Sequence, residues 1–305
     1  MSKNIIAIDL GSNSIRFLKL DCKTKKPIST FHRTVKTADG LAQTGRISYP
    51  ALDRIIVAIN EAKEHMDFSN AQIRAVTTEA IRQAQNGQEI LDGIKNNTGV
   101  EFQIIDGDDE GRYALIATKK RLEILGKSPK SFLIADIGGG STELIFSYGD
   151  SVISKSFPIG IVTLTQSFRS LGEIADAIPA LMSGMKLFCD EVYSKYGKVE
   201  LFVAMAGTPT TISAMKLGMT YTTYNADKIH GTVLSRGDLL KQLKRLLSMS
   251  DEQRTEMVGV GREDLITSGI LIYEEIYNLA GFNSSIVIDD GVREGVAFEG
   301  CEKYL

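Results

Sequence analysis

The sequence contains no tryptophan, only three cysteines and three histidines, and six prolines among its 305 residues. Cys22, Cys189 and Cys301 lie far apart and form no C-x-x-C pair, so we expect free thiols and no disulfide framework. The histidines are equally dispersed, which excludes a zinc cluster built on them. No apolar run approaches the ~18 residues of a transmembrane helix, and the N-terminus lacks the hydrophobic stretch of a signal peptide. These absences predict a cytoplasmic protein without a membrane partner.

The sequence also lacks a large excess of charge of either sign, because its formal net charge is only −3. This balance does not indicate a nucleic-acid partner. The charges are unevenly distributed: residues 1–50 are basic and residues 251–305 are acidic. A basic N-terminal region could attract a polyanionic substrate, and the alternative is ordinary solvated surface. With 43% hydrophobic and 24% charged residues, the chain is typical of a globular protein of one large domain or two.

A pattern of strand, aspartate, glycine turn and returning strand occurs twice. The first copy has strands at 5–9 and 15–20 around the turn Gly11–Ser14, and the second has strands at 132–136 and 142–146 around a turn that begins at Gly138. Two copies of one unit predict two similar domains, and the segment Gly126–Pro129 is typical of the boundary.

The rest of the sequence alternates between helical and extended patterns. We expect a helix over 52–66 with Ser48 near its start, and a helix that begins at the capping residue Ser235. Further predicted elements are strands at 73–77, 102–105, 200–206 and 286–290 and a helix over 107–120. Strands that alternate with helices indicate the α/β class.

Both glycine turns have the chemistry of phosphate loops. Glycine N–H groups approach an anion closely, and successive N–H groups form an anion-binding concavity. The candidate phosphate-binding residues are Gly11, Ser12, Asn13, Ser14, Gly138, Gly139, Gly140, Ser141 and Thr142. The second turn is neither a P-loop, since no Gly-Lys-Ser/Thr follows, nor a dinucleotide fingerprint, since a strand and not a helix follows. The alternative is a hairpin turn that only requires glycine.

Carboxylates flank these turns. Asp9 and Asp136 end the first strand of each copy, and Glu143 follows the second turn. Such residues suit Mg²⁺, which takes one or two carboxylates together with phosphate oxygens and water. The alternative for each aspartate is a turn-capping role.

An acidic run at Asp106–Tyr113 and isolated arginines complete the candidates. The run could supply a general base, although the pattern alone favours a solvated helix start and does not say which carboxylate would face a site. Arg16, Arg82 and Arg262 are candidate phosphate partners, because guanidinium groups match phosphate geometry; each is also an ordinary surface residue on its own.

Taken in order, these motifs resemble the exopolyphosphatase / guanosine pentaphosphate phosphohydrolase (Ppx/GppA) family over essentially the whole chain. The anchors are the segments at 9–16, 78–82, 110–113, 136–143, 228–231 and 291–295. The resemblance implies an α/β fold with two ribonuclease-H-like domains of the actin/hexokinase/70-kDa heat-shock ATPase superfamily and a cleft between them. It implies domains at 1–124, completed by about 293–305, and at 125–292. The chain is similar to the short two-domain form, without the helical extension of longer relatives.

The resemblance also implies an activity and roles for its residues. Relatives release the terminal phosphate of inorganic polyphosphate, or convert guanosine pentaphosphate (pppGpp) to ppGpp, with Mg²⁺. In them the glutamate matching Glu110 is the base toward water, the arginine matching Arg82 contacts phosphate, and those matching Arg16 and Arg262 flank the nucleotide. Asp136, Glu143 and Asp9 are implied as the metal-side acids, and a homodimer is a family-level expectation. The rival interpretations are a sugar or acid kinase of the same superfamily and a non-catalytic nucleotide sensor.

Overall fold

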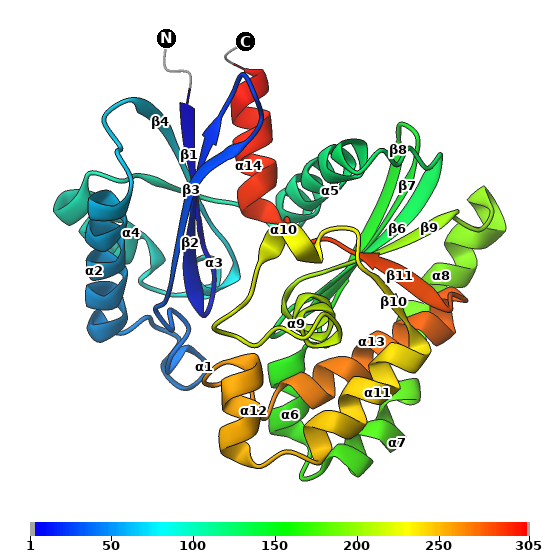
Figure 1. The fold of residues 1–305 in the computed structure, drawn as a ribbon. Coiled ribbons are helices and arrows are strands. Elements are labelled where there is room, and N and C mark those ends of the chain that lie inside the picture. The colour runs from blue at the N-terminus through cyan, green and yellow to red at the C-terminus, as the bar shows by residue number, and fades with distance from the viewer. Residues whose placement is uncertain (1–3, 304–305) are drawn as a thin grey trace. The chain divides into compact units, whose positions relative to one another are not determined.

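A computed structural model describes residues 4–303. The described chain divides into two compact units: one contains the residues up to Ala117 and those from Asp290 onward, and the other is Thr118–Asp289. Each unit is built on its own sheet with helices packed against it (Figure 1). The α/β class predicted from the sequence is therefore confirmed.

The first unit contains a five-stranded sheet in the order β3-β2-β1-β4-β5. Its elements are β1 (Asn4–Leu10), β2 (Ser14–Asp21), β3 (Pro27–Thr34), α1 (Leu41–Thr44), α2 (Tyr49–His65), β4 (Ala71–Thr77), α3 (Glu79–Gln83), α4 (Gly87–Thr98), β5 (Phe102–Ile104), the start of α5 (Gly107–Ile124) and α14 (Val292–Glu302). The strands β1, β2 and β3 pair antiparallel, whereas β4 and β5 continue the sheet parallel to β1.

The second unit contains a six-stranded sheet in the order β10-β11-β9-β6-β7-β8. Its elements are the end of α5, β6 (Ser131–Ile137), β7 (Thr142–Tyr148), β8 (Ser151–Phe157), α6 (Ile161–Ser167), α7 (Leu171–Leu181), α8 (Ser183–Tyr196), β9 (Leu201–Met205), α9 (Gly207–Lys216), α10 (Ala226–Ile229), β10 (Val233–Ser235), α11 (Arg236–Leu247), α12 (Asp251–Val258), α13 (Ile266–Ala280) and β11 (Ser284–Val287). Here β6, β7 and β8 form the antiparallel part, and β9 and β11 are parallel to β6.

The two sheets share one topology, as the repeated sequence pattern predicts. In each, three consecutive antiparallel strands are followed by two strands parallel to the first, and only the second sheet adds an antiparallel edge strand, β10. In β1 the alternation of Ile5 and Ala7 with Ile6 and Ile8 supplies apolar side chains to both faces of the sheet. A strand with both faces covered consists of a continuous run of apolar residues, which is why β1 could be predicted from the sequence.

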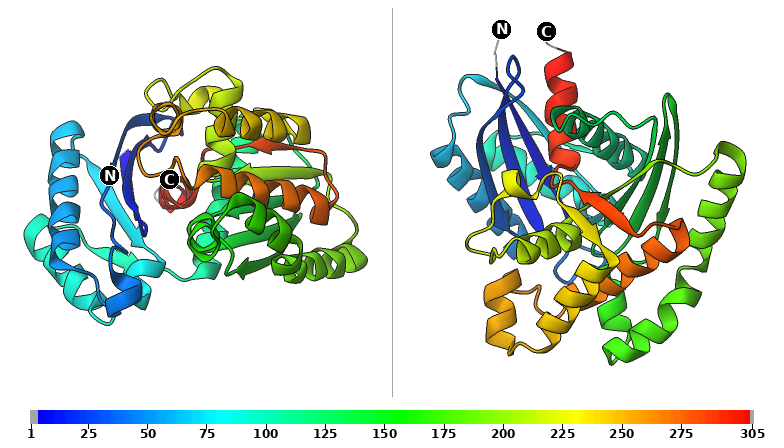
Figure 2. Two further views of the ribbon diagram at one scale, coloured as in Figure 1. Left: turned by 90° about the horizontal axis from the view of Figure 1, so that it is seen from below. Right: turned by 45° about the vertical axis from the view of Figure 1, so that its right-hand side comes forward.

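Helices cover both faces of the first sheet. Helices α2 and α4 pack on one face, and α14 packs with the start of α5 on the other (Figure 1). Both views in Figure 2 show α14 running beside the blue strands β1 and β2. The last described helix thus completes the unit that the first strands begin.

Several predicted boundaries differ from the observed ones by a few residues. The helix expected at 52–66 is α2, which begins at Tyr49 because the Ser48 hydroxyl caps it by accepting from the Ala51 N–H at 3.4 Å. The strand expected at 286–290 ends at Val287, and the strand expected at 200–206 is β9, which α9 follows at Gly207. The third strands β3 and β8 were not predicted, because most of their residues are exposed and carry little apolar pattern.

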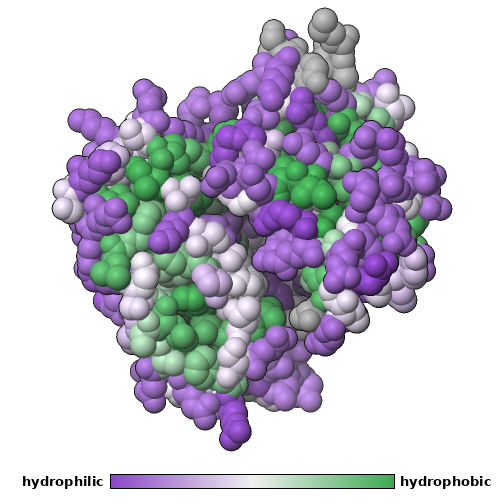
Figure 3. Space-filling model, turned by 180° about the vertical axis from the view of Figure 1, so that it is seen from behind, coloured by the Kyte–Doolittle hydropathy of each residue, from purple (hydrophilic) through white to green (hydrophobic). Residues whose placement is uncertain are grey.

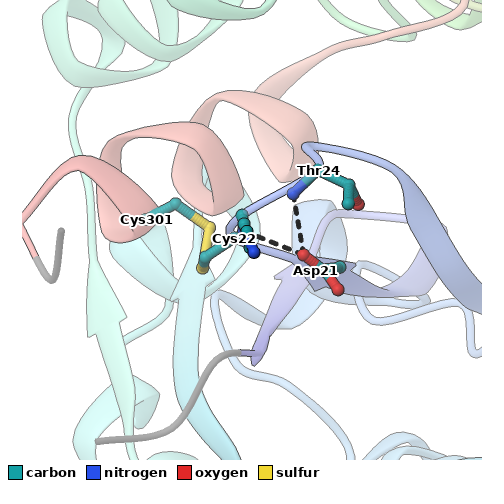
Figure 4. The surroundings of a disulfide bond; sticks show 5 residues. Asp21, Cys22, Thr24 and Cys301 are labelled. Atoms are coloured by element: carbon teal, nitrogen blue, oxygen red, sulfur yellow. Dashed lines mark hydrogen bonds between the residues drawn. A yellow bond between two sulfur atoms is a disulfide. The ribbon is translucent and has the colours of Figure 1, made fainter.

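The prediction of three free cysteines is wrong for two of them. Cys22 follows β2 and Cys301 lies in the last turn of α14, and the two form a disulfide with their Cα atoms 5.1 Å apart (Figure 4). Their sequence separation of 279 residues hid a pairing that only the packing of α14 on β2 creates. The turn beside Cys22 is fixed by the Asp21 carboxylate, which accepts from the N–H groups of Lys23 and Thr24 at 2.8 Å each. Cys189 is a free thiol, and it is buried.

The surface mixes apolar and polar residues. On the face drawn in Figure 3, apolar side chains in green are interspersed with polar ones in purple, as on most globular proteins. Across the described chain, every helix is too short or too polar to cross a lipid bilayer.

Candidate active site

The parallel strands of the first sheet bring three predicted site segments to one edge. Strand register pairs Leu10 with Thr77 and Thr77 with Ile104, so β1, β4 and β5 end at the same level. The Thr77 hydroxyl donates to the Leu10 carbonyl at 2.9 Å, and the Ile105 N–H donates to the Thr77 carbonyl at 2.9 Å, which joins the three strand ends. The glycine turn, helix α3 and helix α5 begin directly after these ends. Ligands bind at this edge of open α/β sheets.

The first glycine turn presents free N–H groups to solvent. The Gly11 N–H closes the turn by donating to the Ser14 carbonyl at 3.0 Å. The carbonyl groups of Ser12 and Asn13 accept from the segment that follows β3. Within residues 4–303, no group accepts a hydrogen bond from the N–H of Ser12 or of Asn13, and both residues are exposed. Two adjacent free N–H groups with hydroxyls beside them form an anion-binding concavity.

Arg82 and Glu110 face each other at this edge. Arg82 lies in α3, and its Nη1 is 3.2 Å from Oε1 of Glu110, which lies in the first turn of α5. The same Nη1 donates to the Ile105 carbonyl. Both side chains are about one-third exposed, at 35% and 29%, so the pair is open to solvent and to a ligand. The positive end of a helix also favours a carboxylate at this position.

Helix α14 supports the segment of α5 that carries Glu110. A Cβ built on Gly295 would lie 2.1 Å from the Tyr113 carbonyl oxygen, so only glycine permits this approach of the two backbones. Next to it, Arg112 of α5 forms an ion pair with Glu299 of α14. Arg112 lies over the ring of Tyr113, with its guanidinium carbon 4.3 Å from the ring centroid. These contacts fix the position of the α5 start relative to the sheet.

Asp9, Arg16 and His32 form a row across β1, β2 and β3. The register places Arg16 opposite both Asp9 and His32. Burial raises the pKa of Asp9 above its ordinary value, the charges of Arg16 and Arg293 oppose this shift, and that of Glu294 adds to it. For His32, burial lowers the pKa, and the nearby arginines lower it further. Arg16 itself is exposed at the level of the glycine turn.

The second glycine turn repeats this arrangement in the other unit. The Gly138 N–H donates to the Ser141 carbonyl at 2.9 Å, just as in the first turn. The carbonyls of Gly138 and Gly139 accept from the first N–H groups of α6, and a Cβ on Gly160 would collide with Gly139 at 2.3 Å. The N–H groups of Gly139 and Gly140 have no acceptor in the described part of the chain, and both residues are exposed. The Thr142 hydroxyl is turned away from the loop, since it donates to the Ile159 carbonyl at 2.6 Å.

Two carboxylates of the second unit meet beside its turn. Asp136 and Glu143 are cross-strand partners on β6 and β7. One oxygen of Glu143, Oε1, accepts from the hydroxyls of Ser141 at 2.6 Å and Ser156 at 2.7 Å, which orients the side chain. The described residues contain no group of three or more histidine, cysteine or acidic side chains arranged for a metal. A pair of carboxylates fits Mg²⁺, which completes its shell with water and substrate phosphates; it does not fit a metal held by protein ligands alone.

In the second unit, the side chain of Arg262, which follows α12 in the sequence, packs against the N-terminus of α9. A Cβ on Gly207 would be 2.3 Å from its Nη2, so the glycine leaves room for the guanidinium against the helix N-terminus. Ala206, which precedes Gly207, has φ 70° and ψ −169°, a backbone region that is essentially confined to glycine. Burial raises the pKa of the neighbouring Tyr224, as do the charge of Asp289 and a hydrogen bond with it. Both backbone strain and perturbed titration are typical of functional sites.

The structure thus brings together Gly11–Ser14, Arg82 and Glu110 in one unit, and Asp136, Gly138–Ser141 and Glu143 in the other. Sequence reasoning missed Ala206, Tyr224 and Asp289. Of these, only Asp289 had a signal, since it is an acid at the end of a predicted strand.

Comparisons with known proteins give matches over nearly the whole chain. A sequence model of the Ppx/GppA phosphatase family matches residues 21–304. The exopolyphosphatase 2 of Mycobacterium tuberculosis is 29% identical, with 96% of this chain and 97% of that protein covered. The crystallised Ppx/GppA enzyme of Aquifex aeolicus is 31% identical, with a TM-score of 0.78 and 97% and 99% of the two chains covered. An exopolyphosphatase structure from Cytophaga hutchinsonii, 21% identical over 98% of each chain, shares the fold with a TM-score of 0.83.

Proposed function

Because the chain belongs to the Ppx/GppA phosphatase family, we propose that it is a phosphohydrolase that releases the terminal phosphate of inorganic polyphosphate. The observation that carries the proposal is the edge of the first sheet, where free N–H groups of Ser12 and Asn13 share one level with the Arg82–Glu110 pair. The names of the mycobacterial relatives support the same reaction. The predicted Ppx/GppA resemblance is confirmed by the family match.

The proposed reaction needs placement and charge compensation more than covalent chemistry. The N–H groups of the turn and the hydroxyls of Ser12 and Ser14 would hold phosphoryl oxygens. Arg82 would bind another oxygen and oppose the negative charge that develops as the phosphoanhydride breaks. Because these donors are fixed before substrate binds, little reorganisation is needed in the transition state.

Glu110 is the proposed general base. It would accept a proton from a water molecule as the water oxygen attacks the terminal phosphorus, and the bond from that phosphorus to the bridging oxygen breaks. The products are inorganic phosphate and a polyphosphate that is one unit shorter. A phosphate bound to Arg82 competes with Glu110 for the guanidinium, so the substrate itself would free the carboxylate to act on water.

Mg²⁺ is the proposed cofactor, and Asp136 and Glu143 of the second unit are its proposed carboxylate ligands. In the first unit, Asp9 is a separate candidate metal-side acid. When bound, Mg²⁺ would neutralise charge on phosphate oxygens. The carboxylate pair supports this assignment because Mg²⁺ prefers few protein ligands and several waters. The orientation of Glu143 supports this role, since two serine hydroxyls donate to Oε1 and the other oxygen, Oε2, would bind the ion.

Hydrolysis of pppGpp is the second candidate activity. Arg262 supports it, because a planar guanidinium that lies against the α9 start can stack on a base or bind a ribose hydroxyl. In the first unit, Arg16 is exposed at the level of the first turn and is the other candidate for a nucleotide contact. Both substrates end in a terminal phosphoanhydride and would use the same Glu110.

The test compares phosphate release from long-chain polyphosphate and from pppGpp, with and without Mg²⁺ and without any acceptor molecule. We expect free phosphate from polyphosphate in the presence of Mg²⁺. A kinase would instead require an acceptor hydroxyl, and a nucleotide sensor would bind without turnover. No phosphate from either substrate would overturn the proposal.

A further inference from the structure

The turn that follows β3 is bonded directly to the first phosphate loop. The N–H groups of Val35 and Lys36 both donate to the Asn13 carbonyl at 2.9 Å, and the Ala38 N–H donates to the Ser12 carbonyl at 2.9 Å. These bonds occupy the carbonyl groups of Ser12 and Asn13, whereas the N–H groups of the same two residues have no acceptor among the described residues. The segment Val35–Ala38 is therefore part of the structure that shapes the loop.

Lys36 has a left-handed backbone in this turn, with φ 48°. Residues other than glycine, asparagine and aspartate rarely take such values, and a lysine does so only where its surroundings dictate it. Here they do: Arg54 of α2 donates through Nε to the Val35 carbonyl at 2.7 Å and through Nη2 to the Lys36 carbonyl at 3.2 Å.

A second feature of this turn lowers the stability of the folded protein. Thr37 is fully buried, and its hydroxyl has no hydrogen-bond partner among the described residues. An unsatisfied buried hydroxyl and a left-handed lysine in adjacent positions both oppose stability. Such costs persist mainly at sites where the resulting geometry serves binding or catalysis.

The Lys36 side chain is exposed, and its ammonium has no carboxylate within 4.0 Å in the described chain. The acid closest in sequence, Asp39, pairs instead with Arg54, at 3.8 Å. The loop Gly11–Ser14 contains no lysine or arginine. In the second unit, the segment Gly160–Thr163 occupies the place that Val35–Ala38 has here, and it contains none either. With its backbone bonded to Asn13, the flexible stem of Lys36 can bring the ammonium to an anion held by the loop.

We propose that Lys36 is a phosphate-binding residue that supplies the positive charge missing from the first phosphate loop. This inference rests on the proposed function for its substrate, a chain of phosphates. The strained turn fixes the lysine at the loop, and the ammonium binds a non-bridging oxygen of the bound polyphosphate. A contact made equally in the ground state and in the transition state contributes to KM and not to kcat.

The test substitutes Lys36 by asparagine, which tolerates the left-handed backbone but has no charge. We expect KM for polyphosphate to rise about tenfold with kcat changed less than twofold, as for the loss of one charge-assisted contact. Lys36→Arg should recover most of the affinity. Thermal unfolding of Lys36→Asn should occur at the same temperature or higher, because the substitution relieves the backbone.

Lys25→Asn is the control for the change of a left-handed lysine to asparagine. Lys25 also has a positive φ, of 56°, but it lies in the turn between β2 and β3 at the opposite end of these strands from the loop. Its substitution should leave KM unchanged. An unchanged KM in Lys36→Asn, or an equal change in both variants, would overturn the inference.

A binding measurement separates this inference from the proposed function. Titration of the protein with tripolyphosphate in a calorimeter requires no turnover. If the wild type hydrolyses nothing but binds tripolyphosphate about tenfold more tightly than Lys36→Asn, the phosphohydrolase proposal fails and the Lys36 contact stands. If the wild type does not bind tripolyphosphate at all, both are overturned.

Discussion

The guanidinium of Arg82 lies 3.2 Å from the carboxylate of Glu110, although the two residues belong to different helices. Neither side chain is buried enough for the ion pair to contribute much to stability, since exposed pairs are worth about 0–1 kcal/mol. The pair instead places a guanidinium beside the proposed general base at the end of the sheet before any substrate binds. Loss of the pair should therefore affect turnover more than stability.

Replacement of Glu110 by glutamine should therefore abolish most activity and preserve the fold. We expect kcat to fall by about 10²–10⁴, the usual contribution of a general base. Phosphate release at saturating polyphosphate measures the effect, and Tm should change by little. Asp108→Asn is the control, because Asp108 lies in the same helix turn and is exposed. Near-normal turnover in folded Glu110→Gln protein would remove Glu110 from the mechanism.

Ala206→Gly should stabilise the protein. The backbone of Ala206 lies in a region that costs a side-chain-bearing residue about 1–3 kcal/mol. Glycine removes this strain but loses about 0.4–1 kcal/mol through the greater freedom of the unfolded chain. The net gain in the free energy of unfolding should be about 1 kcal/mol, measured by urea titration. Ala204→Gly, in the regular part of β9, is the control and should lower the free energy of unfolding. A lower free energy of unfolding in both variants would show that the backbone of Ala206 is not strained.

Reduction of the Cys22–Cys301 disulfide should destabilise the first unit. A disulfide that closes a long loop typically contributes 2–4 kcal/mol, mostly by restricting the unfolded chain. Thermal unfolding with and without reductant measures this, and the double variant Cys22→Ser/Cys301→Ser should match the reduced wild type. The remaining thiol is a useful control, because burial raises the pKa of Cys189 to about 12 and makes it unreactive. Equal Tm with and without reductant would contradict the prediction.

The ion pair between Arg112 and Glu299 should make stability depend on acid pH. Burial raises the pKa of Glu299, but hydrogen bonds and charge from Lys303 and Arg112 outweigh it, so the folded pKa lies below the ordinary 4.5. A carboxylate with a lowered pKa stabilises the folded state above its unfolded pKa, and this contribution is lost as pH falls through the folded value.

Glu299→Gln should accordingly cost about 1 kcal/mol at pH 7 and almost nothing at the acid end of the titration. Urea unfolding from pH 7 down to pH 3 measures the difference between variant and wild type. The exposed Glu302 on the same helix offers a control, Glu302→Gln. A difference in the free energy of unfolding between Glu299→Gln and wild type that grows as pH falls would contradict the prediction.

The local parts of this structure could be predicted from sequence. A strand, an aspartate and a glycine turn follow one another without a break at Ile5–Ser14 and again from Phe132, and hydrogen bonds within each turn determine its shape. Parallel order then places the ends of β1, β4 and β5 at one edge. The acidic run at 106–110 alone did not single out Glu110. Only the family resemblance did, because the ion-pair partner lies 28 residues away.

Features that depend on distant segments could not be predicted. The left-handed backbone of Lys36 follows from bonds to Asn13 and Arg54, and no local pattern encodes it. The disulfide requires α14 to pack beside β2. The free-thiol prediction failed for that reason, since spacing along the chain carries no information about two cysteines brought together by the tertiary fold.

The discontinuous first unit has a consequence for how the protein is made. Ribosomes deliver the N-terminal strands first, yet the helix that covers Ile5, Ala7 and Leu18 on the sheet emerges only after the whole second unit. During translation this apolar sheet face has only the start of α5 to cover it until α14 is made, whereas the contiguous second unit can fold as soon as its own residues leave the exit tunnel. A nascent chain arrested before Val292 should therefore be a preferred client of chaperones that bind exposed apolar surface.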